Sequence, residues 1–213
     1  MGAGGFTGFG EAVVDLYEGL EADNSKAYWA EHRAVYEEQV RAPMLALLAD
    51  LEPVFGRGRV FRPHRDVRFS ADKSPYKSHC GAITENGHYV QVSADGLLVA
   101  AGNYTMAPAQ VARYRAAVDD ERVGGELEAV VAAVRAGGDT VDGDRLRTRP
   151  RGTRPDHPRL ELMRHRSLYA WHVWPPDEGL HSPAALERVA STWRRLEPLA
   201  TWLAEHVGRA LDD

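Results

Sequence analysis

The apolar positions of the first fifty residues repeat with the period of an α-helix. The spacing i, i+3, i+4 and i+7 predicts a first helix that follows Gly10 as its cap and buries one face. A second stripe predicts a longer helix, which Pro43 kinks or divides near Arg41 because proline lacks a backbone N–H. The two stripes are Val13, Leu16, Tyr17 and Leu20, then Trp29, His32, Tyr36, Val40, Met44, Leu47 and Leu51.

The next part of the chain has the two-residue period of β-strands. Residues 89–102, with Asp95-Gly96 at the turn, have the pattern of a β-hairpin. Residues 59–69 are expected to be extended and bent, since Pro63 cannot donate to a central ladder and is confined to an edge or a bulge.

Two more helices and a strand are expected in the second half. Pro108 begins a helix that runs to about Val118, and Gly137-Gly138 ends the helix after it. Residues 167–174 then form a strand, with Tyr169, Trp171 and Val173 on one face and Leu168, Ala170, His172 and Trp174 on the other.

The last helix opens with Ser182 as N-cap and Pro183 as its first residue, and Pro198 kinks it. Helices at both ends around mainly antiparallel strands predict one α+β domain over residues 1–213. Residues 139–158 form a long Arg-, Pro- and Gly-rich loop, and a loop of this length is often functional.

Composition places the chain among ordinary globular domains. It has 213 residues, of which 44% are hydrophobic and 27% charged. The single cysteine, Cys80, supports neither a disulfide framework nor a CxxC zinc site. The N-terminus lacks a basic region followed by an apolar core, and the aliphatic run 97–101 is too short to cross a bilayer. We therefore expect a cytoplasmic protein without membrane insertion.

The net charge of −5 conceals a segregation of charge. Residues 57–79 hold seven Lys or Arg against two Asp, and residues 145–166 hold eight Arg against one Asp and one Glu. Two basic segments thus sit in an acidic chain. That acidity argues against broad nucleic-acid coating, whereas a local positive cleft concentrates a small anion.

The most informative stretch runs from Phe61 to Lys77. If it is extended, Asp66 and Arg68 share a face, and arginine forks bind carboxylates or phosphates through two hydrogen bonds. Ser70 and Ser74 would add donors to the same anion. Two interpretations remain open, a ligand site and a closed salt-bridge network. The network would consist of Arg65, Asp66, Arg68, Asp72 and Lys73.

A series of motifs extends along nearly the whole chain. They are Phe6-Thr7-Gly8-Phe9, Asn24 to Trp29, Arg33 and Tyr36, Arg65-Asp66-Val67-Arg68-Phe69-Ser70, Asp72-Lys73-Ser74-Pro75-Tyr76-Lys77, Asp95-Gly96, Gly102 and Tyr104, Arg113 and Arg115, Pro150-Arg151-Gly152, Asp156-His157-Pro158 and Leu160 to Arg164. Through these motifs the chain resembles a bacterial conserved-hypothetical family called domain of unknown function 2461. The resemblance implies an architecture but no reaction and no catalytic residues.

Other chemistries have weaker support. The chain has no P-loop, dinucleotide-binding, nucleophile-elbow or zincin motif. We expect no metal and no cofactor, because the candidate ligands have no recognised spacing and the surrounding arginines repel a cation. Those candidate ligands are His64, Asp66, His79, Asp156 and His157.

Three further groups have a structural and a chemical reading. Asp156 and His157 form an acid/base pair or, as the favoured alternative, the start of a short helix. Cys80 is expected to be a small core residue rather than a nucleophile. The aromatic residues of the 167–174 strand are expected in the core rather than in a pocket.

We expect a protein that binds a small anionic ligand, phosphorylated or carboxylated, in a cleft between residues 62–77 and 149–166. In an enzymatic version, Arg65, Arg68 and Arg159 would hold the anion while Asp66, Asp72 or His157 moved a proton. The alternatives are a structural or partner-binding module with internal arginine pairs and, with less support, a nucleic-acid-binding protein. The predicted ligand-binding residues are Arg62, Arg65, Arg68, Lys73, Lys77, Arg151 and Arg159.

Overall fold

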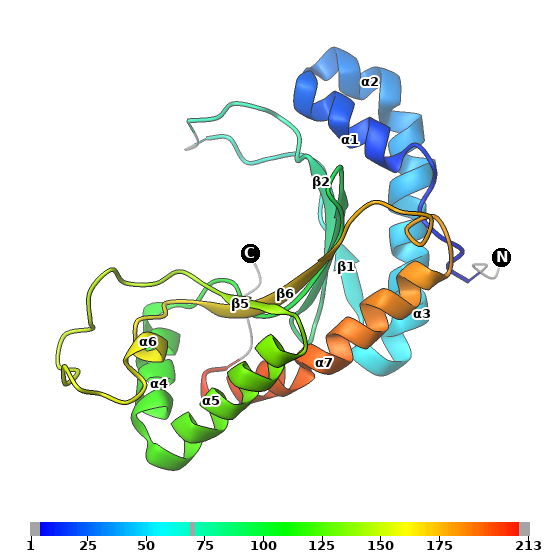
Figure 1. Ribbon diagram of the computed structural model, residues 1–213. Coiled ribbons are helices and arrows are strands. Elements are labelled where there is room, and N and C mark those ends of the chain that lie inside the picture. Colours follow the sequence, from blue (N-terminus) through cyan, green and yellow to red (C-terminus); the bar gives the residue numbers. More distant parts are fainter. Residues whose placement is uncertain (1–4, 69–70, 209–213) are drawn as a thin grey trace. The chain divides into compact units, whose positions relative to one another are not determined.

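The computed structural model describes residues 5–68 and 71–208, which form helices and one antiparallel sheet (Figure 1). Within these residues the sheet has six strands in the order β1-β2-β3-β4-β6-β5. The strands are β1 Gly58–Val60, β2 His79–Thr84, β3 His88–Ser93, β4 Gly96–Asn103, β5 Thr140–Asp142 and β6 Leu168–Trp174. The predicted α+β class with a mainly antiparallel sheet is confirmed.

The chain divides into two compact units. Unit 1 comprises residues 1–85, 89–99 and 173–191, and unit 2 comprises residues 86–88, 100–172 and 192–213. The strands β4 and β6 and the helix α7, Ala184–His206, each run from one unit into the other.

The helices of unit 1 follow the predicted periodicity. They are α1 Val13–Ala22, α2 Lys26–Val35, the π-helical turn η1 Tyr36–Arg41 and α3 Ala42–Phe55. All four apolar positions predicted for α1 are buried, although α1 begins at Val13 with Ala12 as its N-cap residue rather than directly after Gly10.

Pro43 explains the π-helical turn that precedes α3. Proline has no N–H for the carbonyl of Gln39, so that carbonyl needs another donor. The Gly10 N–H donates to the Gln39 carbonyl at 2.9 Å, and the Ala12 N–H donates to the Gln39 side-chain oxygen at 3.1 Å. The predicted division near Arg41 is therefore a change of helix type that also binds the N-terminal segment.

The strands of unit 1 bury one face against α3. Cys80, Ala82, Val90 and Val92 are buried, whereas the alternate positions of β2 and β3 are mostly half-buried (Figure 1). The predicted β3–β4 hairpin is confirmed, and β1 lies at the edge of the sheet, where Pro63 required the chain to be. The sequence did not predict β2.

Unit 2 has its own apolar core. Its helices are α4 Pro108–Asp119, α5 Glu121–Ala136 and the short α6 Leu160–Met163, in addition to the second part of α7. Tyr114 from α4, Leu127 from α5, Leu168 from β6 and Leu196 from α7 meet in one buried cluster. The short helix begins at Leu160 rather than at His157, and β5 occupies the start of the predicted long loop.

Candidate functional site

Residues 61–68 leave β1 and residues 71–78 return into β2, and these two segments form an arm (Figure 1). We call it the basic arm. The Arg65 N–H donates to the Pro75 carbonyl at 2.9 Å, and the Lys77 N–H donates to the Pro63 carbonyl at 2.8 Å. The two sides of the basic arm are thus paired. Phe69 and Ser70, which belonged to the predicted site, lie outside the described residues.

The beginning of α2 anchors the basic arm. The Asn24 amide group donates to the Tyr76 carbonyl at 3.1 Å and accepts from the Tyr76 N–H at 3.0 Å. The rings of Trp29 and Tyr76 stack with centroids 4.6 Å apart. The returning side of the arm is therefore fixed next to β2.

Toward its tip, the basic arm holds two ion pairs. Arg68 donates to Asp66 through Nε at 3.0 Å and NH2 at 2.6 Å, and Arg65 donates to Asp72. Asp72 also accepts from the backbone N–H and the hydroxyl of Ser74, at 2.9 and 2.6 Å. Hydrogen bonds from Arg68 lower the pKa of Asp66 to about 2, and those from Ser74, followed by Arg65, hold the pKa of Asp72 far below its usual range.

These contacts engage three of the predicted ligand-binding residues within the arm itself. Arg65 and Arg68 hold carboxylates, and the Lys73 ammonium group donates to the Val67 carbonyl at 3.0 Å. The predicted salt-bridge network describes this part of the arm. Asp66 and Asp72 are ionised partners in it.

In unit 2, Arg159 extends into the protein instead of toward solvent. Its side chain is 8% exposed, and its Nε donates to the Val118 carbonyl at 2.7 Å. Its NH2 group donates to the carbonyls of Asp119 and Asp120 at 3.3 and 3.2 Å. The Val118 and Asp119 carbonyls end α4, where a helix supplies no partner, so Arg159 supplies donors to them; the Asp120 carbonyl also accepts from the Gly124 N–H of α5 at 2.9 Å.

His157 is occupied in the same region. One ring nitrogen, Nε2, lies 3.0 Å from the Asp119 carboxylate, and Nδ1 accepts from the Arg159 N–H at 3.1 Å. The Asp156 carboxylate lies 3.9 Å from Arg154. The structure therefore pairs His157 with Asp119 rather than with Asp156. Arg151, the remaining predicted ligand-binding residue of unit 2, is exposed on the loop.

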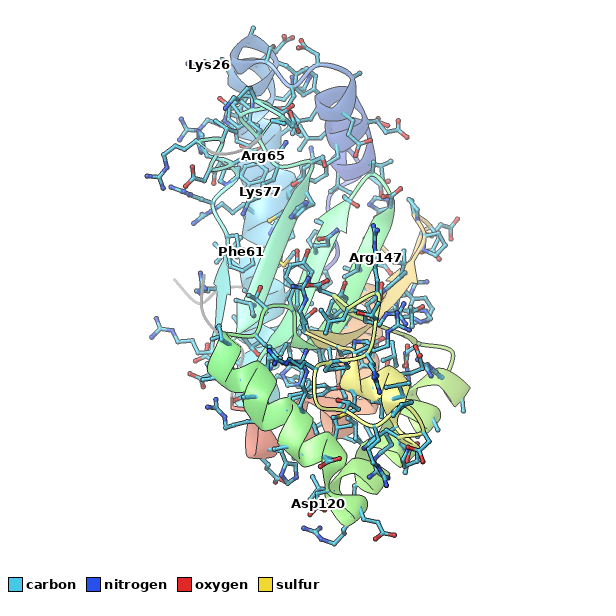
Figure 2. All side chains as sticks on the ribbon, turned by 90° about the vertical axis from the view of Figure 1, so that its left-hand side faces the viewer. Lys26, Phe61, Arg65, Lys77, Asp120 and Arg147 are labelled. Atoms are coloured by element: carbon cyan, nitrogen blue, oxygen red, sulfur yellow. The ribbon has the colours of Figure 1, made fainter. Side chains whose placement is uncertain are left out.

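The base of the basic arm gathers cations of a different kind. We call Arg62, Lys77 and His79 the arm base. Lys77 lies two residues before His79, the first residue of β2, and the chain bends at Ser78 between them. The Lys77 nitrogen lies 5.0 Å from the centre of the Phe61 ring (Figure 2). Within residues 5–68 and 71–208, no carboxylate forms an ion pair with Arg62, Lys77 or His79.

Electrostatics of the arm base reflect this lack of carboxylates. Burial and then the charge of Arg62 lower the pKa of Lys77. Burial and then the charge of Lys77 lower the pKa of His79. Arg62 also contributes to the low pKa of Asp66, although that carboxylate is bound to Arg68. The positive charges of the arm base therefore act on one another, whereas Arg65 and Arg68 toward the tip of the arm are paired with carboxylates.

The neighbouring strand, β3, adds polar groups on the face of the sheet that carries His79 and Gly81. Gln91 pairs with Gly81 across β2 and β3, and the Tyr89 hydroxyl donates to the Gln91 side-chain oxygen at 2.7 Å. A Cβ at Gly81 would lie 2.6 Å from the Tyr89 hydroxyl, so glycine lets the tyrosine cross the strand. Because the Gln91 oxygen accepts from Tyr89, its nitrogen end presents donors. Figure 2 views this face, which is turned away from α3.

Sequence reasoning included Arg62 and Lys77 but not His79, Gln91 or Tyr89 as ligand-binding residues. The available signal was alternation along the strand, since positions 79 and 81 share one face of β2. Recognising it required β2, which was missed.

Among the described residues, three other features were considered: the single cysteine, groups of metal-ligating side chains, and helices that could cross a membrane. Cys80 is buried with the Tyr36 hydroxyl 3.9 Å from its sulfur, and burial raises the pKa of the thiol to about 11, in agreement with a core residue. In the described ranges, no three His, Cys, Asp or Glu side chains gather as metal ligands. None of the helices described has the length and apolarity needed to cross a membrane.

Comparison with known proteins gives a family and no activity. No curated protein matches the chain. One family model, described as a conserved hypothetical protein, matches residues 12–202 and so includes the basic arm, the sheet and nearly all of α7. The chain therefore belongs to the conserved hypothetical protein family DUF2461.

Proposed function

We propose that this protein binds a small anionic ligand, phosphorylated or carboxylated, at the arm base. The observation that carries this proposal is the group of three cationic or protonatable side chains, Arg62, Lys77 and His79, none of which forms an ion pair with a carboxylate of the described residues. An ammonium group that is half-buried beside another cation is unfavourable unless an anion accompanies it.

The geometry favours a compact ligand on the sheet face that is turned away from α3 (Figure 2). Lys77 is held over Phe61, and Tyr76, the residue before it, is anchored by Asn24 and Trp29, so the Lys77 ammonium group is positioned by fixed neighbours. Such a preorganised group of donors binds an oxyanion with little loss of side-chain freedom. An extended polyanion would instead meet the acidic remainder of the chain, which disfavours nucleic acid.

The proposal concerns binding rather than a reaction. The two carboxylates considered as proton carriers, Asp66 and Asp72, are kept ionised by their arginine and serine partners. His157 has both ring nitrogens engaged. These contacts support structural roles for the three residues.

Thermal denaturation with increasing sodium sulfate or sodium phosphate tests this proposal, with sodium chloride at matched ionic strength as the reference. A ligand present at one hundred times its Kd adds about 2.7 kcal/mol to the free energy of unfolding. Sulfate or phosphate should raise the stability of the wild-type protein. The Lys77→Gln variant should show no such increase, and without added anion it should be at least as stable as wild type.

The control variant is Lys73→Gln. Lys73 has the same charge and lies on the same arm, but its ammonium group is bound to the Val67 carbonyl. The Lys73→Gln variant should therefore still be stabilised by sulfate. Equal responses of all three proteins would show that sulfate acts through general exclusion from the surface, and the proposal would be wrong.

A further inference from the structure

Between β5 and α6 of unit 2, residues 144–156 form a loop whose start is held by the chain that follows α6 (Figure 1). We call it the arginine loop. The Leu146 N–H donates to the Arg164 carbonyl at 2.9 Å, and Arg164 Nε donates to the Leu146 carbonyl at 2.8 Å. The Arg166 N–H donates to the Asp144 carbonyl at 2.7 Å. The backbone at the start of the loop is therefore fixed.

The tip of the arginine loop is a tight turn. The Thr153 N–H donates to the Pro150 carbonyl at 3.2 Å across Arg151 and Gly152. Gly152 has a φ of 85°, the left-handed conformation that glycine supplies in such turns. Arg149 closes the turn further, since its NH1 group donates to the Thr153 carbonyl at 3.1 Å. The turn leaves Arg151 exposed at the tip.

The exposed arginines of this loop outnumber the carboxylates near them. Residues 145–154 contain five arginines and no Asp or Glu. Of the carboxylates nearby in sequence, Asp144, Asp156 and Glu161 each form an ion pair with an arginine, at 2.6, 3.9 and 3.0 Å. Four of the five loop arginines pair with no carboxylate of residues 5–68 or 71–208, and all four are exposed. They are Arg145, Arg147, Arg149 and Arg151, of which Figure 2 labels Arg147.

We propose that the arginine loop binds an acidic segment of a partner protein. A guanidinium group binds a carboxylate through two hydrogen bonds, and a loop with a fixed backbone loses little freedom when it binds. This surface does not include the arm base, so the inference goes beyond the proposed function and stands apart from it.

The loop favours an acidic peptide over a nucleic acid. Residues 143–158 contain no Phe, Tyr or Trp, whereas proteins that bind single strands stack the bases on such rings. The net charge of the whole chain is −5, so a long polyanion that extended beyond the loop would be repelled. A short run of Asp and Glu side chains meets only the loop.

Fluorescence anisotropy with a labelled oligoglutamate peptide tests this inference. Wild type should bind the peptide at low salt and bind it more weakly at physiological ionic strength, because salt screens exposed charges. The loop variant replaces Arg145, Arg147 and Arg151 with glutamine. An exposed ion pair contributes about two- to fivefold in affinity, so the loop variant should bind about tenfold to one hundredfold more weakly.

The control variant replaces Arg33, Arg57 and Arg122, three exposed arginines outside the loop, with glutamine. It has the same net charge as the loop variant and should bind the peptide as wild type does. NMR titration of wild type gives a second measurement that needs no variant. The backbone amide signals of Arg151 and Gly152 should be among those that shift most when oligoglutamate is added.

Four results would contradict the proposal. Wild type would fail to bind oligoglutamate at low salt, or the loop variant would keep its affinity. The control variant would lose as much affinity as the loop variant, so that net charge alone explains binding. An oligothymidylate with the same net charge as the peptide would bind the loop more tightly, which would assign the loop to nucleic acid.

Discussion

Replacing Arg159 with methionine should destabilise the folded chain by roughly 2–4 kcal/mol. Methionine keeps most of the apolar stem and removes the guanidinium group, which donates to the Val118, Asp119 and Asp120 carbonyls. A hydrogen bond from a charged donor contributes about 1.5–3 kcal/mol, and a buried carbonyl left without a donor costs about 1–3 kcal/mol. The bond at 2.7 Å should count fully, and the two at 3.2 and 3.3 Å only in part.

Arg122→Met is the matched control for this change. Arg122 lies on the next helix and forms an exposed pair with Glu126, four residues along. Such pairs contribute about 0.3–0.5 kcal/mol, so this variant should remain within about 0.5 kcal/mol of wild type. Urea unfolding of the three proteins measures both differences, provided that the dependence on urea is unchanged.

The same variants test whether Arg159 contacts a ligand. Arg159→Met should keep the stabilisation by sulfate, because the guanidinium group is engaged with α4. A loss of less than 0.5 kcal/mol in stability would refute the reasoning about α4, and loss of the sulfate response would restore Arg159 as a ligand-binding residue.

Three further predictions follow from the packing. Gly125→Ala should stabilise α5 by up to about 1 kcal/mol, since a Cβ there meets nothing within 4 Å, whereas Gly124→Ala should destabilise because its Cβ would lie 2.3 Å from the Val118 carbonyl; urea unfolding distinguishes the signs. Burial lowers the pKa of His79 and His165, so the unfolded chain binds more protons just below pH 6.5 and the free energy of unfolding should rise with pH through that window; a flat profile contradicts this. Calorimetry should show one unfolding transition, because β4, β6 and α7 run through both units, and two transitions would contradict a single domain.

Elements with a long apolar period could be predicted from the sequence. The stripes of α1 to α3 and the Tyr89–Val92 alternation are local signals, and the buried residues confirm them. The short strands β2 and β5 could not, since β2 contains Cys80-Gly81-Ala82 without alternation and β5 has only three residues. These segments form strands because they pair with neighbouring strands, and a local sequence pattern does not show that pairing.

Charge composition predicted where basic side chains concentrate but not which of them are paired. Asp66 and Arg68 lie two residues apart, so their pair could be anticipated from an extended chain. The partners of Arg159 are carbonyls about forty residues earlier and the Glu128 carboxylate at 3.7 Å, and no local sequence pattern predicts these contacts. Lys77 and Arg62 can be distinguished from the other cations of the basic arm only once the structure shows the partners of Arg65, Arg68 and Lys73.

The most direct test of the anion site is a crystal structure of the protein grown or soaked with selenate, a tetrahedral dianion that anomalous scattering identifies. The account predicts an anomalous peak within hydrogen-bond distance of the Lys77 nitrogen, with Arg62 and His79 around it. A peak only at Arg65 and Arg68 or at Arg151, with none at Lys77, would contradict the proposed site.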